Sequence, residues 1–286
     1  GKAGFIGRLA AKRVGVPKII HSIHGPSFGL FQGWATNALF RGAERFAGRM
    51  TDHFVTVADA MRDQYLAAGI SQADDYTRIP SGFDLQPFLD AENSPTKRAS
   101  LGLSPGDFVV GKIARLFELK GHDDLFAIAP RLARRIPNIR FLLVGDGVWR
   151  GRFERLAKEI GCGQNFIFTG LVPPSEIPSL VGVMDALVHL SRREGLPRAL
   201  PQAMAAAKPV VAYDCDGAGE VCLDGKTGHL IEPGDLAKLE ERLAKLTNDA
   251  PLRTALGQAG RKLVEEEFTV EQLVERQYEL YKRLLA

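Results

Sequence analysis

The chain has 286 residues, enough for two α/β domains of about 100–200 residues each. Hydrophobic residues make up 45% and charged residues 25%, as in an ordinary globular protein, and no apolar run approaches the ~18 residues of a membrane-spanning helix. The 37 Lys and Arg against 34 Asp and Glu leave a net charge of +3, which is too balanced to imply nucleic-acid binding. Three scattered cysteines without a C-x-x-C pair argue against a disulfide framework or a zinc site and favour the cytoplasm.

The first hundred residues predict only a small sheet. The expected strands are Ile19–Ile23, Phe54–Val57 and Tyr76–Ile79, and the expected helices are Gly4–Val14, Trp34–Arg49 and Ala58–Ala68. Three strands are few for a doubly wound domain, so we expect residues 1–105 to be a partial Rossmann-like domain whose first part is missing. Segment 87–105 is rich in Pro, Ser, Asn and Gly and is expected to be a connector.

Residues 106–268 alternate strand-like and helix-like segments. The expected strands are Phe108–Ala114, Arg140–Val144, Asn165–Thr169, Ala186–Leu190, Pro209–Tyr213 and Gly228–Ile231. The expected helices are Asp123–Arg135, Arg150–Ile160, Pro178–Met184, Pro197–Ala207 and Asp235–Asn248. This alternation indicates βαβ units, hence a parallel sheet covered on both faces and a complete Rossmann-like domain.

The last predicted helix, 269–286, opens with the capping-box spacing Thr269 to Gln272. Its apolar stripe consists of Val270, Leu273, Val274, Tyr278, Tyr281 and Leu284. Such a stripe needs a surface to cover it, and we expect this helix to pack back on the N-terminal domain.

The segment GKIARLFELKG (111–121) runs from a predicted strand into a loop with two cations, Arg115 and Lys120. The carboxyl ends of the strands in an open α/β sheet form a ligand crevice. A planar guanidinium together with a mobile ammonium suits a diphosphate. The alternative is a pair of solvated surface cations.

Two further turns follow strands of the same domain. In LVGDG (143–147) the glycines let the backbone pass close to a ligand, although such a turn is natural without one. In SRREGLPRALPQAMA (191–205), Glu194 and Gly195 follow a buried strand and precede a proline-containing helix start, and Gln202 lies about two turns along. Free amides at such a helix start bind phosphate, and ordinary packing is the alternative.

Three other segments are candidates. In DGAGE (216–220), glycines and Glu220 would direct amides and a carboxylate into the same crevice, or would only form a helix-entry turn. His24 directly follows the strand Ile19–Ile23, where a structural, hydrogen-bonded histidine is the alternative. The loop FGLFQGW (28–34) exposes three aromatics near Arg41, Arg45 and Arg49 and would seat a lipid-linked acceptor at an anionic membrane surface, or fold into the core.

In this order, the four motifs of the second domain resemble family 4 of the retaining glycosyltransferases. That family carries G-x-x-x-R-x(3,4)-K-G, then V-G-x-G, then E-G-x-P followed by E-A-M-A. The likeness is dense from Gly111 to about Asp235, and PSGFD (80–84) is similar to the family's P-N-G-V-D turn, with Ser81 and Phe83 as departures. It implies an α/β GT-B fold, in which two Rossmann-like domains face a cleft, here with domains 1–105 (incomplete) and 106–268.

The resemblance also implies roles for individual residues. The implied donor-binding residues are Gly111, Arg115, Lys120, Gly145, Gly147, Glu194, Gly195, Leu196, Pro197, Gln202, Gly217, Ala218, Gly219 and Glu220. Arg115 and Lys120 would hold the donor diphosphate and Glu194 the transferred sugar, and with His24 they are the implied catalytic residues. Gln202 would meet the ribose, but the family usually has glutamate there. Glutamine loses a charge-assisted bond, a difference of ~1 kcal/mol, so we expect weaker donor binding.

The implied function is a hexosyltransferase-type glycosyltransferase. It would move a sugar from a nucleoside diphosphate, UDP rather than GDP, to a glycan or lipid-linked hydroxyl acceptor in envelope polysaccharide or lipopolysaccharide synthesis. The resemblance implies no cofactor and no metal requirement. We expect a cytoplasmic protein at the inner face of the membrane, with peripheral membrane contact and no nucleic-acid partner. The alternatives are a non-catalytic donor-binding homologue, suggested by Gln202 and the missing N-terminal part, and a GT-B sugar-nucleotide epimerase.

Overall fold

The computed structural model describes residues 1–29 and 31–286. Contacts group them into two units, each containing a parallel sheet. Unit 1 consists of Gly1–Gly82, Arg193–Leu196 and Val270–Ala286, and unit 2 consists of Phe83–Arg192 and Pro197–Thr269. Every predicted strand is present, with its ends within one residue of the prediction.

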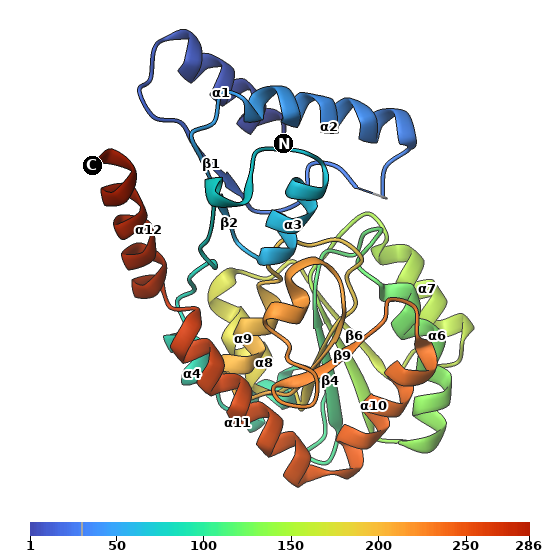
Figure 1. Cartoon of the computed structure of the whole chain (residues 1–286). Coiled ribbons are helices and arrows are strands. Elements are labelled where there is room, and N and C mark those ends of the chain that lie inside the picture. Colours follow the sequence, from blue (N-terminus) through green and yellow to red (C-terminus); the bar gives the residue numbers. More distant parts are fainter. Residues whose placement is uncertain (30) are drawn as a thin grey trace. The chain divides into compact units, whose positions relative to one another are not determined.

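Unit 1 has three parallel strands in the order β1-β2-β3, and Figure 1 labels the first two. Its elements are α1 (Lys2–Arg13), β1 (Ile20–Ile23), α2 (Trp34–Gly48), β2 (His53–Thr56), α3 (Asp59–Ala67), η1 (Ala73–Asp75), β3 (Tyr76–Arg78) and α12 (Val270–Leu285). The pairing places Ile20 beside His53 and Phe54 beside Tyr76. The rings of Phe54 and Tyr76 stack with centroids 4.8 Å apart, which joins β2 to β3 in the core.

A buried ion pair joins the first two helices of unit 1. The Arg8 guanidinium donates to the Glu44 carboxylate at 2.5 Å, and both side chains are almost fully buried. Its Nε also donates to the Gly4 carbonyl at 3.0 Å. Burial, together with nearby Arg8, lowers the pKa of His21 to about 4, so this histidine is neutral at neutral pH.

Helix α12 covers the sheet of unit 1 with only part of its predicted stripe. Leu280 is buried against Val55 and Ile79, and Leu273 and Leu284 pack on the same cluster. By contrast, Val274 and Tyr278 are 58% and 61% exposed, and Val270 and Tyr281 are exposed as well. The prediction of one buried stripe was therefore wrong. At 100° per residue, positions 273, 280 and 284 share one side, whereas the other four lie on the neighbouring side.

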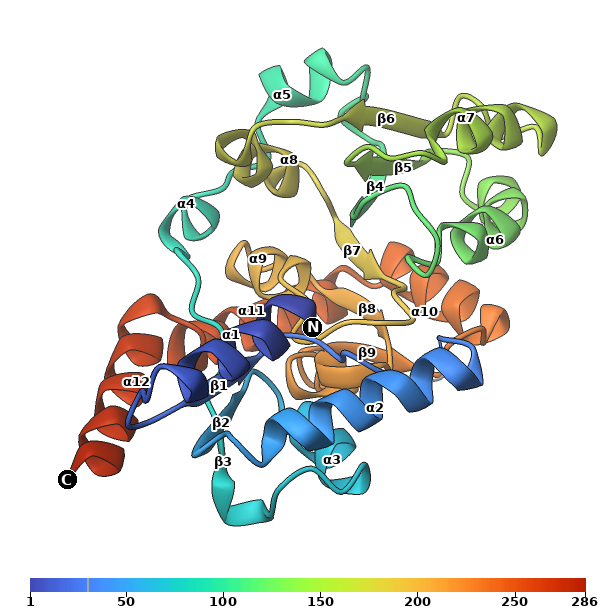
Figure 2. The same ribbon diagram turned by 90° about the horizontal axis from the view of Figure 1, so that it is seen from above.

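Unit 2 contains a six-stranded parallel sheet in the order β6-β5-β4-β7-β8-β9, and Figure 2 shows the strands in this sequence. The strands are β4 (Phe108–Ile113), β5 (Ile139–Val144), β6 (Phe166–Gly170), β7 (Ala186–His189), β8 (Val210–Tyr213) and β9 (Gly228–Ile231). This is the doubly wound order, in which the winding direction reverses between β4 and β7. The carboxyl ends of these two strands therefore mark the expected ligand crevice.

Helices cover both faces of this sheet. The helical elements are α4 (Gln86–Leu89), α5 (Pro95–Ser100), α6 (His122–Arg135), α7 (Arg150–Glu159), η2 (Pro174–Glu176), α8 (Ile177–Gly182), α9 (Ala199–Ala205), η3 (Asp216–Glu220), α10 (Leu236–Asn248) and α11 (Ala250–Glu267). Figure 1 shows α6, α7 and α10 along one face and α8, α9 and α11 along the other. The segment 87–105, expected to be a connector, contains most of α4 and all of α5.

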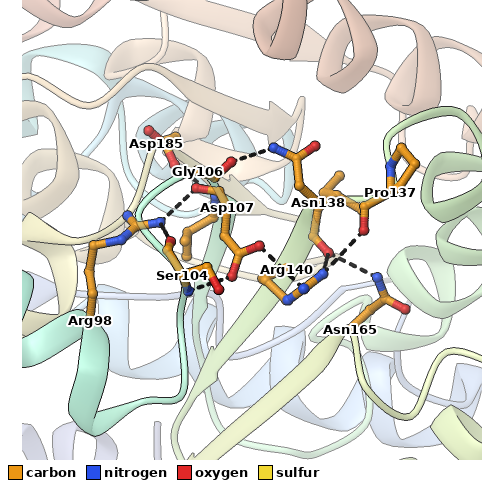
Figure 3. Close-up of polar contacts among 11 residues, drawn as sticks. Arg98, Ser104, Gly106, Asp107, Pro137, Asn138, Arg140, Asn165 and Asp185 are labelled. Carbon is orange, nitrogen blue, oxygen red and sulfur yellow. Dashed lines mark hydrogen bonds and ion pairs between the residues drawn. The ribbon is translucent and has the colours of Figure 1, made fainter.

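Arg98 of α5 forms a buried polar network at the amino end of β4 (Figure 3). Its Nη2 donates to the carbonyls of Ser104 at 2.9 Å and Asp107 at 2.7 Å. Its Nη1 donates to the Val183 carbonyl at 3.3 Å. The Asp107 carboxylate in turn pairs with Arg140 of β5 at 3.2 Å. One guanidinium thus satisfies three backbone carbonyls that surround the start of the sheet.

Replacement of Arg98 by Leu should lower the free energy of unfolding by about 2–4 kcal/mol, because buried carbonyls lose their donor. Urea unfolding followed by circular dichroism measures this loss. Arg135→Leu is the matched control, since Arg135 is exposed and pairs with Glu240 at the surface, and it should change stability by less than about 0.5 kcal/mol. Equal stability of the two variants would contradict the role of the Arg98 network.

Candidate functional site

The loop that follows β4 carries the two predicted cations in different surroundings. The Lys120 ammonium donates to the Ser191 hydroxyl at 3.3 Å. Arg115 is exposed, and its guanidinium lies 5.5 Å from the centre of the Phe117 ring. Leu119 has φ of +65°, which is unusual for a residue with a side chain. Backbone strain of this kind persists only where the surrounding contacts hold it.

The loops after β4 and β7 are interlocked. The Leu119 carbonyl accepts from the Arg192 amide at 2.8 Å and from the Ser191 hydroxyl at 3.3 Å. Gly121, with φ of +63°, lies so close to Leu190 that a Cβ atom there would overlap the Leu190 carbonyl oxygen. The structure therefore joins the segment of Lys120 to the segment that leads to Glu194 at the point where the sheet reverses its winding.

The glycine turn after β5 packs against the same β4 loop. A Cβ on Gly145 would overlap the Ala114 carbonyl, and one on Gly147 would overlap the Leu116 carbonyl. The Leu116 amide donates to the Asp146 carbonyl at 3.0 Å. Chain packing therefore requires both glycines, in agreement with the alternative that such a turn is natural without a ligand.

Gly111 lies within β4 and is buried there. A Cβ at this position would overlap the side chain of Met184. Packing against Met184, just after α8, thus accounts for glycine at this position. The residues of this segment that remain candidates for donor contact lie in the loop after Ile113.

The segment after β7 continues into a helix that starts later than predicted. Pro197 precedes α9, which begins at Ala199 and has only seven residues. Gly195, Leu196 and Pro197 are buried, whereas Glu194 and Gln202 are half-buried. The helix predicted at Pro197–Ala207 is present, but it begins two residues later, with Arg198 at the N-cap position.

Residues Arg193–Leu196 belong to unit 1 by their contacts. Arg193 donates to the Pro26 carbonyl at 2.8 Å, and its guanidinium lies 3.6 Å from the centre of the Phe31 ring. A Cβ on Gly195 would overlap the His24 carbonyl oxygen. The backbone that carries Glu194 therefore passes directly beside His24, which is exposed just beyond β1.

The predicted aromatic loop is mostly not exposed. Phe28 is buried with its ring 5.0 Å from that of Tyr65, and Phe31 is half-buried beneath Arg193. Trp34, at the start of α2, is 86% exposed. Leu30 lies outside the described residues. The expectation of three exposed aromatics was wrong for Phe28 and Phe31, which pack within unit 1.

The segment 216–220 forms the 3₁₀-helix η3 directly after β8. Gly217 and Ala218 are buried, and Gly219 and Glu220 are half-buried. Asp216 begins the turn with φ of +50°. The segment that ends in Glu220 thus follows the carboxyl end of β8, the strand next to β7.

Sequence reasoning missed the part played by Ser191. Its hydroxyl lies between the Lys120 ammonium and the Leu119 carbonyl, and it is buried. A polar residue immediately after a buried strand is a signal for such a role, because strand ends gather at one edge of a parallel sheet.

In residues 1–29 and 31–286, His, Cys, Asp and Glu form no group of three or more that could hold a metal ion. Within the same residues, no helix combines the length with the apolar character that a bilayer span requires.

Two family models match the chain. The model "Glycosyl transferases group 1" matches residues 93–263, and "Glycosyltransferase Family 4" matches residues 2–87. A GDP-mannose-dependent alpha-(1-6)-phosphatidylinositol monomannoside mannosyltransferase of Mycolicibacterium smegmatis is 31% identical, covering 88% of this chain and 66% of that protein. A UDP-Gal:alpha-D-GlcNAc-diphosphoundecaprenol alpha-1,3-galactosyltransferase of Escherichia coli is 25% identical, covering 98% and 73%. The chain thus spans just under two thirds of the mannosyltransferase.

Solved structures show the same architecture. HepE of Anabaena, in complex with UDP, superposes with a TM-score of 0.86 at 24% identity, covering 99% of this chain and 76% of that one. The C-terminal domain of LpcC, a group 1 glycosyl transferase family protein from Francisella tularensis, superposes with a TM-score of 0.60 at 26% identity. It covers 66% of this chain and 100% of that domain. At these levels of identity, the likeness to HepE concerns the fold.

Gly147→Ala should lower the free energy of unfolding by about 1–3 kcal/mol, because the added methyl group displaces the Leu116 carbonyl. Thermal or urea unfolding measures the loss. Gly151→Ala is the control in the adjacent helix α7, where the nearest atom is the end of the Arg155 side chain at 3.6 Å. That variant should change stability by less than about 0.5 kcal/mol, because the added methyl group has room in the first turn of the helix. A Gly147→Ala protein as stable as the wild type would show that the turn is not tightly packed.

Proposed function

The chain belongs to family 4 of the glycosyltransferases, and from this premise we propose that it transfers a sugar from a nucleoside diphosphate to a hydroxyl acceptor with the anomeric configuration retained. Its α/β fold is of the GT-B type. The observation that carries the proposal is the interlocking of the loops after β4 and β7. It brings a lysine and the approach to Glu194 together at the edge of the sheet where doubly wound folds bind nucleotides.

In this proposal Arg115 and Lys120 bind the donor diphosphate and stabilise the charge that develops on the leaving nucleotide. Two features support the assignment. Lys120 is already oriented by the Ser191 hydroxyl, so part of its side-chain entropy is lost before binding. Arg115 is exposed on the same loop, with its guanidinium against Phe117 and accessible to a ligand.

The remaining residues contact other parts of the donor. Glu194 and His24 are proposed to contact the transferred sugar, and Gln202 the ribose. Glu220, with the backbone of Gly217, Ala218 and Gly219, is proposed to lie near donor sugar and phosphate. The approach of the Gly195 backbone to His24 supports a shared role for His24 and Glu194. Cations, not a metal ion, neutralise the diphosphate in this proposal.

The donor nucleotide is proposed to be UDP or GDP, with UDP favoured. The E. coli relative is named for UDP-Gal and the mycobacterial relative for GDP-mannose. Their named acceptors are a diphosphoundecaprenol-linked sugar and a phosphatidylinositol mannoside. We propose a glycan or lipid-linked acceptor of the same general kind, as in the synthesis of envelope polysaccharides.

Gln202 supports a second candidate function, a protein that binds the donor without transferring the sugar. Glutamine at this position of α9 retains hydrogen bonding but has no charge. Incubation of the chain with UDP-glucose, UDP-galactose, UDP-N-acetylglucosamine and GDP-mannose separates the two functions. Transfer to an acceptor or donor hydrolysis supports catalysis, whereas nucleotide binding without turnover of any donor supports the second candidate.

Arg115→Ala and Lys120→Ala should each lower kcat by about 10²–10³-fold, equivalent to about 2.7–4 kcal/mol of transition-state stabilisation. Nucleotide release from the active donor, measured in a coupled assay, gives the rate. Lys158→Ala, on the surface of α7 away from the strand ends, is the charge-matched control and should retain wild-type turnover. Near-wild-type turnover in both test variants would overturn the diphosphate assignment.

We also propose that α2 contacts an anionic membrane surface peripherally. Leu39 and Phe46, seven residues apart on one side of the helix, are 69% and 51% exposed, and Arg49 is exposed nearby. Glu44, the acidic residue of α2, is buried against Arg8, so the outward surface of the helix is apolar and cationic. Such a face suits the interface of anionic lipids.

The double variant Leu39→Ser/Phe46→Ser should weaken binding to phosphatidylglycerol-containing vesicles by at least about tenfold, because two apolar side chains no longer enter the interface. Vesicle co-sedimentation measures the binding. Leu171→Ser, which changes an exposed leucine of unit 2, is the matched control and should bind as the wild type does. Equal binding of the wild type to anionic and to pure phosphatidylcholine vesicles would refute the proposed contact.

A further inference from the structure

Three side chains outside the predicted site form a cluster beside it. The Asp124 carboxylate of α6 accepts from the Arg192 guanidinium at 2.7 Å and from the Tyr213 hydroxyl at 2.9 Å, both at the same oxygen. The Arg192 guanidinium also lies 5.6 Å from the centre of the Tyr213 ring. We call Asp124, Arg192 and Tyr213 the clasp.

The clasp is partly shielded from solvent. Tyr213 is fully buried, and the Asp124 side chain is only 16% exposed. The hydrogen bond to Asp124 raises the pKa of Arg192, and burial raises the pKa of Tyr213, so Arg192 is charged and Tyr213 neutral throughout the physiological range. The Arg192 side chain is 40% exposed, so the geometry of the pair rests on its charge-assisted hydrogen bond and on the second donor, the buried Tyr213 hydroxyl.

Arg192 and Tyr213 of the clasp each adjoin a different candidate segment. Arg192 lies between Ser191, which contacts Lys120, and Glu194, two residues further along the chain. Its amide donates to the Leu119 carbonyl at 2.8 Å, in the loop where Leu119 has a positive φ. Tyr213 is the last residue of β8 and comes directly before the segment that leads to η3 and Glu220.

We propose that Asp124 and Tyr213 are positioning residues that act through Arg192 on Lys120 and Glu194. This inference rests on the proposed function. By fixing the Arg192 side chain, the clasp keeps the Arg192 amide in its hydrogen bond to the Leu119 carbonyl. This backbone hydrogen bond fixes the positions of the β4 loop and of the start of the segment that carries Glu194. Since a displacement of about 1 Å at a catalytic group can cost 10²-fold in rate, release of Arg192 should affect the chemical step more than donor binding.

The test compares Asp124→Ala, Asp124→Asn and Tyr213→Phe with the control Asp123→Ala. Asp123 is the neighbouring residue and makes an exposed pair with Arg152. Hydrogen exchange, followed by mass spectrometry on the peptides that contain Leu119 and Arg192, reports the backbone bond without requiring activity. Steady-state kinetics with the active donor report kcat and KM separately.

In Asp124→Ala, exchange at the Arg192 amide should rise by about tenfold or more, and kcat should fall by about tenfold, while donor KM stays within about threefold. Tyr213→Phe, which removes one hydroxyl group and keeps the ring, should raise exchange at the Arg192 amide by about threefold and lower kcat by about threefold. Asp124→Asn keeps an acceptor oxygen and should recover most of the protection and of the turnover. Asp123→Ala should match the wild type in all three measurements.

Unchanged exchange in both Asp124→Ala and Tyr213→Phe would overturn the inference, and so would raised exchange with wild-type kcat. A rise in the donor KM as large as the expected fall in kcat, with kcat itself unchanged, would also overturn the inference, because that result indicates a role in donor binding alone. If Asp124→Ala does not fold, Tyr213→Phe decides by the same criteria. If the wild type processes no donor, the proposed function fails, and the exchange at Arg192 alone still supports or overturns the clasp.

Discussion

The backbone hydrogen bond from Arg192 to Leu119 joins the two loops that carry the candidate chemistry of this chain. It links the carboxyl ends of β4 and β7, the strands between which the sheet reverses its winding. The close approach of Gly121 to Leu190 makes this junction sterically specific. Lys120 can therefore be held by Ser191 before any ligand arrives, and such preorganisation is what an electrostatic site requires.

Much of the fold could be predicted because the strands of unit 2 are apolar runs between turn residues. Gly228–Ile231 was predicted to the residue, and the six strands form the parallel sheet that the alternation of strands and helices indicated. Helix α11 was not predicted, because its buried face includes Gly257 and Gly260, which give no hydrophobic signal. Gly257 lies there so closely against Ala207 that a larger residue would overlap its carbonyl. Helix contacts made through glycine, which has no side chain, are not visible in the hydrophobic pattern of a sequence.

At the candidate site, residue types were more predictable than their surroundings. The cations and glycines of the β4 and β5 loops lie at the strand ends, as expected of a parallel sheet. Phe28 and Phe31, however, are covered by Tyr65 and Arg193, residues distant in the sequence, so no local pattern distinguishes them from exposed Trp34. The partnership of Asp124 with Arg192 spans 68 positions and is likewise a product of the tertiary fold.

The central claim is that the loop after β4 binds the diphosphate of a nucleotide. Isothermal titration of the chain with UDP and uridine, and with GDP and guanosine, tests it most directly. The account predicts that one diphosphate binds at least about tenfold more tightly than its nucleoside and that this difference shrinks as salt increases, because charge-assisted bonds to phosphate supply it. A nucleoside that binds as tightly as its diphosphate, or no binding of either diphosphate, would contradict the account.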